Sequence, residues 1–223
     1  MRLMVLLTWA MLAGLAAGAA QAGAWPREKG SLFATATVRL SWPQDIATWT
    51  STEPTQVYRT IYVEYGMSED LTLGIDLGRA VSGANKTILF AQYPLRRDGR
   101  GPAVSGQLGF GRIAGAQIVR PGLSVGWGLP RGWLSLDGVA EIGLRDGATD
   151  YKLDMTWGWN VYRDSKLIVQ IQTGDTQADP PFARLAPSIV VPINRRLQLE
   201  SGVSWGLRGD TAMGVTLGLW SEF

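Results

Sequence analysis

Apolar and polar residues alternate along most of the chain after residue 22. The alternation is regular over 71–78, 119–129 and 151–161, where an apolar side chain stands at every second position. A period of two places apolar side chains on one face of a β-strand and polar ones on the other. No window of similar length carries the 3.6-residue period of an amphipathic helix. The pattern therefore predicts an all-β chain.

Turn-forming residues divide this pattern into twelve expected strands. Most are about 9–13 residues long, which is the length that a tilted strand needs to cross a lipid bilayer. Ten or fourteen strands are the alternatives, should a weak strand or a loop be assigned wrongly. The expected strands cover residues 31–42, 55–67, 71–79, 86–96, 103–113, 117–129, 133–145, 150–163, 166–174, 182–193, 197–208 and 211–223.

The connections between the expected strands alternate in length. Those after even-numbered strands are tight and rich in turn residues, whereas those at 43–54, 80–85 and 175–181 are longer. The connections after the fifth and the eleventh strand are short and break this alternation. Short turns on one side, longer loops on the other and an even number of strands are typical of a transmembrane up-and-down antiparallel β-barrel with both termini in the periplasm.

The aromatic residues on the apolar face fall near the strand ends. Two aromatic girdles that bound an apolar band are typical of a lipid-facing barrel, whereas a soluble β-sandwich buries its aromatic residues in mid-strand. The girdle expected at the turn end contains Tyr65, Tyr93, Trp127, Trp159 and Phe223. The girdle expected at the loop end contains Trp42, Phe110, Tyr151 and Trp205.

The first 22 residues have the pattern of a secretory signal peptide. Arg2 supplies a positive start, residues 3–17 form an apolar segment, and residues 20–22 (Ala-Gln-Ala) are a small-x-small cleavage motif. An uncleaved membrane anchor is the weaker alternative, because two glycines dilute an apolar segment that is barely long enough to span. We expect a signal peptide over 1–22, a periplasmic segment over 23–30 that is too short for a plug domain but could enter the lumen, and a barrel over 31–223.

The composition narrows the chemistry that the chain can perform. It contains no Cys and no His, so disulfides, Cys or His metal clusters and imidazole-based triads are excluded. Its 21 Lys and Arg residues nearly balance 19 Asp and Glu residues, and no nucleic-acid motif is present, so a nucleic-acid partner is not expected.

The C-terminus resembles that of Gram-negative outer-membrane β-barrel proteins. Outward residues at 213, 215, 217 and 219 are apolar and lead to a terminal Phe223, although Ser221 stands where that signature has a hydrophobic residue. The resemblance implies outer-membrane lipid as the surroundings and the barrel-assembly machinery as a partner during insertion. A second, ten-residue stretch at 65–74 (YGMSEDLTLG) is similar to a hairpin of a family associated with the meta-pathway of phenol degradation.

Charged residues of the expected strands mostly share the inward parity. A charge on the lipid face near midplane costs a few kcal/mol, so inward charges are expected on energetic grounds. They either form a salt-bridged interior that closes the barrel or line a constriction that selects solutes. The candidate lumen charges are Arg39, Glu64, Asp76, Arg120, Asp137, Glu141, Arg145, Lys152, Asp154, Arg184 and Glu200, with Arg96 and Arg112 as further candidates. The signs are mixed and predict no preference for anions or cations.

Three further features have simple interpretations. Arg59 shares the outward parity, which either snorkelling near the loop end or a register slip would explain. The G-x-S-x-G stretches at 122–126 and 202–206 lie in mid-strand without an imidazole base, so no hydrolase elbow is expected. Asp175 and Asp179 lack the ligand spacing of a Ca²⁺ site, and we expect no metal or cofactor.

Taken together, the sequence predicts a non-enzymatic outer-membrane channel for passive diffusion of small solutes. A closed structural or adhesive barrel is the alternative. A soluble β-barrel that binds an apolar ligand is a third and weaker interpretation.

Overall fold

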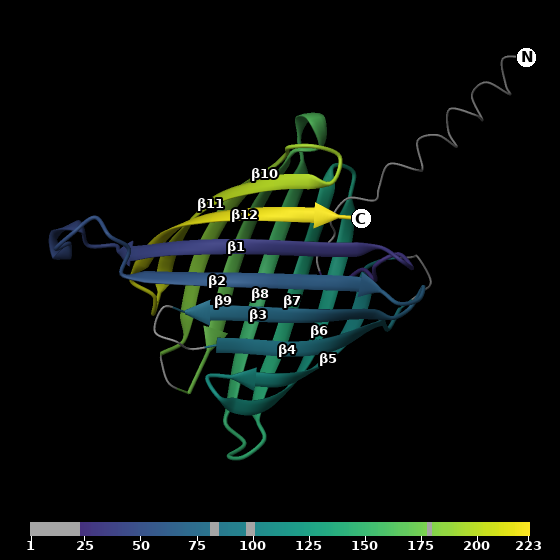
Figure 1. Ribbon diagram of the computed structural model, residues 1–223, viewed down its shortest axis with the longest axis horizontal. Helices are drawn as coiled ribbons and strands as arrows, with labels where there is room; N and C mark the ends of the chain where they lie inside the picture. The colour runs from purple at the N-terminus through teal and green to yellow at the C-terminus, as the bar shows by residue number, and fades with distance from the viewer. Residues whose placement is uncertain (1–22, 81–84, 97–100, 178–179) are drawn as a thin grey trace, which may run out of the picture.

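Twelve antiparallel strands close into one barrel in the computed structural model, which describes residues 23–80, 85–96, 101–177 and 180–223 (Figure 1). Each expected strand overlaps one observed strand, so the predicted all-β, twelve-stranded architecture is confirmed. The expected signal peptide lies outside the described residues. The strands are β1 (Leu32–Pro43), β2 (Gln56–Gly66), β3 (Thr72–Ala80), β4 (Asn85–Pro94), β5 (Ala103–Ile113), β6 (Ala116–Leu129), β7 (Gly132–Gly143), β8 (Thr149–Asn160), β9 (Lys166–Asp175), β10 (Phe182–Pro192), β11 (Leu197–Arg208) and β12 (Ala212–Glu222).

The barrel closes between β1 and β12, and each of the other strands pairs with its neighbours in sequence. Leu32 N donates to Phe223 O at 3.0 Å and Phe223 N donates to Leu32 O at 2.9 Å, so the ladder continues to the last residue. Closure leaves no unpaired sheet edge, which is the condition for a β-structure in lipid. We call the end that carries the termini the turn end and the opposite one the loop end (Figure 1).

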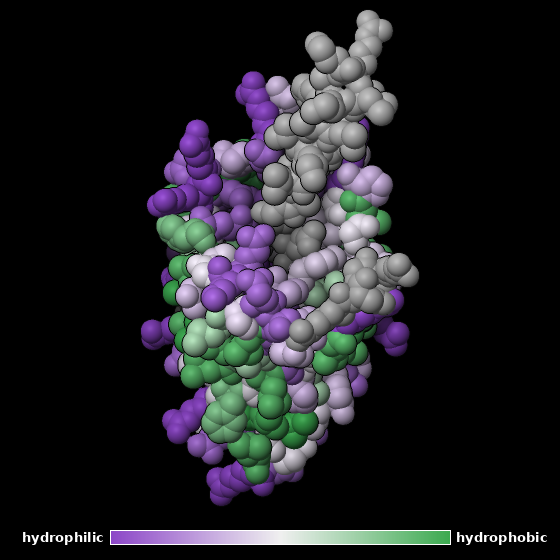
Figure 2. Space-filling view, turned by 90° about the vertical axis from the view of Figure 1, so that its right-hand side faces the viewer, coloured by the Kyte–Doolittle hydropathy of each residue, from purple (hydrophilic) through white to green (hydrophobic). Residues whose placement is uncertain are grey.

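The distribution of side chains is inverted relative to a soluble protein. Leu89, Leu108 and Leu217 point outward with exposed fractions of 61%, 60% and 51%, whereas polar residues such as Ser105 and Ser135 are buried inside. Figure 2, which looks onto the turn end, shows hydrophilic residues across the end and hydrophobic residues gathered on part of the wall. An apolar exterior of this extent is compatible with lipid and not with water.

The nine girdle residues lie on the outer wall at the expected strand ends. Tyr65, Tyr93, Trp159 and Phe223 are exposed at the turn end, and Phe110, Tyr151 and Trp205 are exposed at the loop end. Trp42 and Trp127 are half-buried, and the ring of Trp42 stacks on Trp49 at 6.2 Å between centroids. The described residues include no helix that is long and apolar enough to cross a membrane.

Several inward glycines lie directly beneath aromatic rings. In the strand register Phe90 stands opposite Gly74, Trp133 opposite Gly158 and Phe182 opposite Gly174. A Cβ added to any of these glycines would collide with the ring of its partner. These glycines therefore make room for inward aromatic side chains, so they do not by themselves widen the lumen.

Candidate functional site

The inward side chains enclose a cavity of about 490 Å³ to which all twelve strands contribute. Nine of the eleven candidate lumen charges line it: Arg39, Glu64, Asp76, Arg120, Asp137, Glu141, Lys152, Asp154 and Glu200. Arg184 lies nearer the loop end, where its Nη2 pairs with Asp210 Oδ2 at 2.6 Å.

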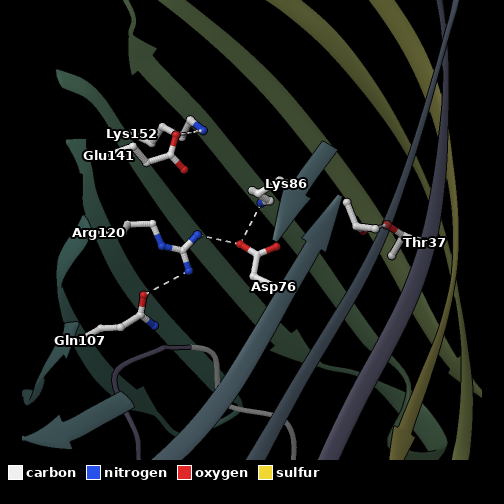
Figure 3. A network of polar contacts seen from close by, with 8 residues as sticks. Thr37, Asp76, Lys86, Gln107, Arg120, Glu141 and Lys152 are labelled. Atoms are coloured by element: carbon white, nitrogen blue, oxygen red, sulfur yellow. Dashed lines mark hydrogen bonds and ion pairs between the residues drawn. The ribbon is translucent and has the colours of Figure 1, made fainter. Parts of the chain in front are cut away.

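Asp76 on β3 is the centre of an ionic network across the lumen. Its Oδ2 accepts from Lys86 Nζ of β4 at 2.8 Å and from Arg120 Nη1 of β6 at 2.7 Å (Figure 3). Arg120 Nη2 also reaches Gln107 Oε1 at 3.4 Å. Asp76 and Arg120 are 9% and 5% exposed, so the network compensates charges that are largely withdrawn from water.

The β7–β8 pair contributes four charged side chains to the cavity lining, which are Asp137, Glu141, Lys152 and Asp154. Lys152 Nζ donates to Glu141 Oε2 at 2.6 Å. Asp137 and Asp154, by contrast, stand directly opposite each other in the strand register. Ser135 Oγ donates to Asp137 Oδ2 at 2.9 Å, whereas the buried Asp137 Oδ1 has no hydrogen-bond partner among the described residues. Two opposed carboxylates repel each other. Neither Asp137 nor Asp154 forms an ion pair among the described residues.

Arg39 also lacks a fixed partner. Its guanidinium lies in the lumen between β12 and β2, and the buried Nε donates to no atom of the described residues. Glu200, on the same side of the barrel, accepts a hydrogen bond from Trp220 Nε1 at 2.8 Å. Both side chains line the cavity, where Glu200 is held by Trp220 and Arg39 forms no ion pair among the described residues.

Residues 23–30, which we call the N-terminal strap, lie inside the turn end of the barrel. Arg27 Nε pairs with Glu64 Oε2 at 2.5 Å, and Arg27 N donates to Thr72 Oγ1 at 2.9 Å. The carbonyl oxygen of Gly23 accepts from Gln92 Nε2 and from Ser105 Oγ at 2.8 Å. The strap thus contacts β2, β3, β4 and β5 and narrows this mouth of the lumen.

An aromatic cluster at the turn end was missed by the sequence analysis, which assigned four of the ten Trp residues to the outer girdles and gave the others no position. Trp133 is 2% exposed, packs with Ile168 and Val190, and is flanked by Trp25 of the strap and by Trp220. The inward position of Trp133 could have been predicted from the sequence, because Trp133 lies four positions before the inward Asp137 and therefore on the same face of β7. Lys86 and Gln107, which complete the Asp76 network, were missed as well.

Three expected lumen charges lie elsewhere. Arg145 is exposed in the turn after β7, because that strand ends two residues earlier than predicted. Arg112 stands opposite Thr87 on the outer wall and shares the parity of the outward Phe110, so its inward assignment was wrong. Arg96 is exposed beyond the end of β4.

The serine motifs lie within regular strands, and the acid pair at 175 and 179 is described only in part. Ser124 and Ser204 lie within β6 and β11, without the strand–turn–helix geometry of a nucleophile elbow. Asp175 ends β9, and Asp179 lies outside the described residues. Within the described ranges, no three acidic side chains are grouped so that they could hold a metal ion.

Comparison with known proteins identifies the fold and not the family. No family model matches the chain, and no curated protein matches its sequence. Among solved structures, the KdgM porin matches with a TM-score of 0.65 at 9% identity, over 85% of this chain and 99% of that one. The NanC porin gives 0.65 at 8% identity over 85% and 98%, and an outer membrane channel from Pseudomonas putida F1 gives 0.60 at 10% identity over 92% and 100%.

These matches show that the chain has the closed twelve-stranded β-barrel fold that is also seen in these outer-membrane porins and channels. The fold alone does not decide between transport and catalysis, since outer membrane phospholipase A from Escherichia coli matches with a TM-score of 0.51 at 12% identity, over 88% of this chain and 91% of that one. The resemblance to the phenol-degradation family is not shown.

Proposed function

We propose that this barrel is a passive outer-membrane channel for small hydrophilic solutes. The observation that carries the proposal is a cavity of about 490 Å³ that is lined from all twelve strands and contains eleven charged side chains, inside a wall whose outer surface is apolar. Diffusion through such a lumen needs no bond chemistry. This agrees with a chain that has no His and whose lumen serines stand within regular strands.

The lumen wall has two chemically different sides. The charged network lies on β3 to β8, whereas the residues that β9, β10 and β12 contribute to the cavity lining are uncharged, and about half of them are polar. Gln170 Nε2 donates to Thr156 Oγ1 at 3.0 Å and Gln172 Nε2 donates to Gln170 Oε1, so this ladder presents amides to the lumen. A wall of amides and hydroxyl groups suits hydroxylated, uncharged solutes.

The balance of charges argues against strong selection by sign. Five basic and six acidic residues line the cavity, and ion pairs neutralise most of the basic ones. A structure of the KdgM porin contains oligogalacturonate, an acidic polymer. A polyanion requires a surplus of positive charge along its path, which this lining lacks. We therefore propose neutral solutes as the principal cargo, with weak ion selectivity.

The N-terminal strap favours one alternative, a closed barrel with a structural or adhesive role. Planar-bilayer recording of the purified protein distinguishes the two functions. Discrete conductance steps that persist in the presence of a neutral sugar, with a reversal potential near zero in a salt gradient, support the channel. A protein that inserts but gives no steps at any voltage, with the strap intact or deleted, supports the closed barrel.

A further inference from the structure

Three arginines face outward at the loop end of neighbouring strands. Arg59 of β2 stands directly opposite Arg79 of β3. Arg112 of β5 stands opposite Thr87 of β4, the strand between β3 and β5. All three side chains are exposed, and β2 is regular at Arg59, so its outward position reflects neither a bulge nor a register slip. With strands about 4.8 Å apart, the three guanidinium groups occupy a strip roughly 15 Å wide.

The positive charge of this strip is not compensated within the described part of the chain. No described carboxylate pairs with Arg59, Arg79 or Arg112, whereas Arg27, Arg120 and Arg184 in the lumen each have an acidic partner. Like charges placed directly opposite across two strands repel each other. The geometry therefore leaves a position for anions supplied from outside the chain.

The wall next to the arginines, toward mid-barrel, is apolar. Ile61, Leu89 and Phe110 point outward there, with exposed fractions of 48%, 61% and 56%, and Leu77 stands opposite Ile61. A row of cations above an apolar wall fits an amphiphile with phosphate groups at its head and acyl chains below. Arginine suits this ligand because its planar guanidinium binds phosphate oxygens in a bidentate manner.

We propose that Arg59, Arg79 and Arg112 bind the phosphate groups of a phosphorylated glycolipid in the outer leaflet. The proposal rests on the outer-membrane placement with the loop end outward, and it does not depend on solute transport. The lipid would neutralise the mutual repulsion of the arginines and fix the depth of the barrel in the bilayer.

The test compares the triple variant R59Q/R79Q/R112Q with the matched control R131Q/R163Q/R195Q, which removes three exposed arginines at the turn end. Thermal unfolding in neutral detergent is followed with bisphosphorylated lipid A, with dephosphorylated lipid A and with inorganic phosphate. We expect bisphosphorylated lipid A to raise the midpoint by several degrees for the native chain and the control, and the triple variant to lose this shift.

Three results would overturn the site: no shift with the native chain, an equal shift with the triple variant, or a full shift with inorganic phosphate or dephosphorylated lipid alone. If the triple variant does not fold, the single variant R79Q serves, with a severalfold higher lipid A concentration at half-maximal shift expected. Conductance of the same samples reports on the proposed channel separately, so that failure of one proposal is not mistaken for failure of the other.

A second site follows from Asp137 and Asp154, two opposed carboxylates in the lumen that form no ion pair among the described residues. Gly23 packs against the Asp137 carboxylate so closely that a Cβ at residue 23 would collide with Oδ1, the oxygen that lacks a partner. The backbone nitrogen of Gly23 is one bond, about 1.5 Å, from its Cα. Asp154, opposite Asp137, adds a second negative charge.

We infer that the α-ammonium group created at Gly23 by cleavage after Ala22 binds the Asp137 carboxylate and locks the strap in the lumen. This inference rests on the proposed signal-peptide cleavage. The ammonium would supply the cation that the Asp137–Asp154 pair lacks, and uncleaved protein would not have it. Glycine fits as the first mature residue because the carboxylate leaves no room for a side chain.

The test uses folded chains that begin at Gly23 or, one residue longer, at Ala22, and an acylating reagent that prefers α-amines at neutral pH. In the chain that begins at Gly23, we expect the α-amine to be labelled at least tenfold more slowly than in its variant D137N or in the chain that begins at Ala22. The control variant E69Q should be labelled at the same rate as the unmodified chain that begins at Gly23. Equal labelling of all folded chains would contradict the ion pair. Should D137N not fold, the longer chain gives the same readout, and N-terminal sequencing of the exported protein checks the cleavage itself.

Discussion

Asp76 of β3 holds two cations, Lys86 of the adjacent strand β4 and Arg120 of β6, two strands further along the barrel wall. The three residues form a unit, since removing the acid leaves two buried positive charges, whereas removing Arg120 leaves a neutral pair. Alternation along β3 was enough to predict that Asp76 faces inward. Its partner Arg120 lies 44 residues away, and no local pattern connects the two.

We expect Asp76→Asn to lower the free energy of unfolding by about 3 kcal/mol, because the remaining cations are desolvated without a counterion. Arg120→Gln should cost roughly 1 kcal/mol, since Lys86 still pairs with the acid. Urea unfolding in lipid vesicles measures both. Equal losses for the two variants would show that Asp76 does not act as the centre of the network.

At the scale of the element, the strands and the strap pack together because tryptophan rings lie against glycines of the barrel strands. Trp133 lies over Gly158, and Trp25 of the strap lies close to Gly126. Strand positions were predictable within a few residues because the apolar period and the turn residues agree. The sequence allowed residues 23–30 to enter the lumen, but their contacts could not be predicted from it, since this segment has no period and is held by side chains of four different strands.

Gly158→Ala should destabilise the barrel by about 1–3 kcal/mol, because the added Cβ overlaps the Trp133 ring and the ring must shift in a packed cluster. Gly128→Ala is the matched control, since nothing lies within 4 Å of a Cβ there. Unfolding free energies and tryptophan emission spectra of both variants provide the measurement. An unperturbed Gly158→Ala variant would show that the ring is not constrained by the glycine.

Arg27→Gln should loosen the strap, because it removes the ion pair with Glu64 that holds the strap against β2. We expect longer or larger open-channel events in planar bilayers, without loss of the fold. Lys29→Gln, an exposed position in the same strap, should leave the conductance unchanged. If the two variants behave alike, the strap does not control the mouth.

At the scale of the whole molecule, closure through β1 and β12 makes the C-terminus a structural element of the barrel. Phe223 completes the ladder with Leu32 through its backbone and exposes 61% of its side chain on the outer wall. The ladder does not need the ring, which leaves the side chain free to serve as the expected insertion signal.

Phe223→Ala should therefore slow insertion by the barrel-assembly machinery severalfold and change the stability of the inserted barrel by less than about 1 kcal/mol, because the backbone pairing is retained. Insertion into vesicles with and without the purified machinery separates the two effects. A similar slowing without the machinery would assign the ring a role in spontaneous folding instead.

The sequence by itself determined most of the faces, because a period of two fixes which side chains point to lipid and which to the lumen, as for Leu217 and Asp76, although Arg112 was assigned to the wrong face. It predicted twelve strands, with ten or fourteen as alternatives. It failed where a residue lies at a strand end, as Arg145 does, because the period carries no information about where pairing stops. Only the tertiary structure decided which charges meet across the lumen, that rings such as Trp133 cover glycines, and that Arg59, Arg79 and Arg112 form one strip. Those contacts depend on how closure aligns neighbouring strands and brings distant ones together, which no segment of the chain encodes locally.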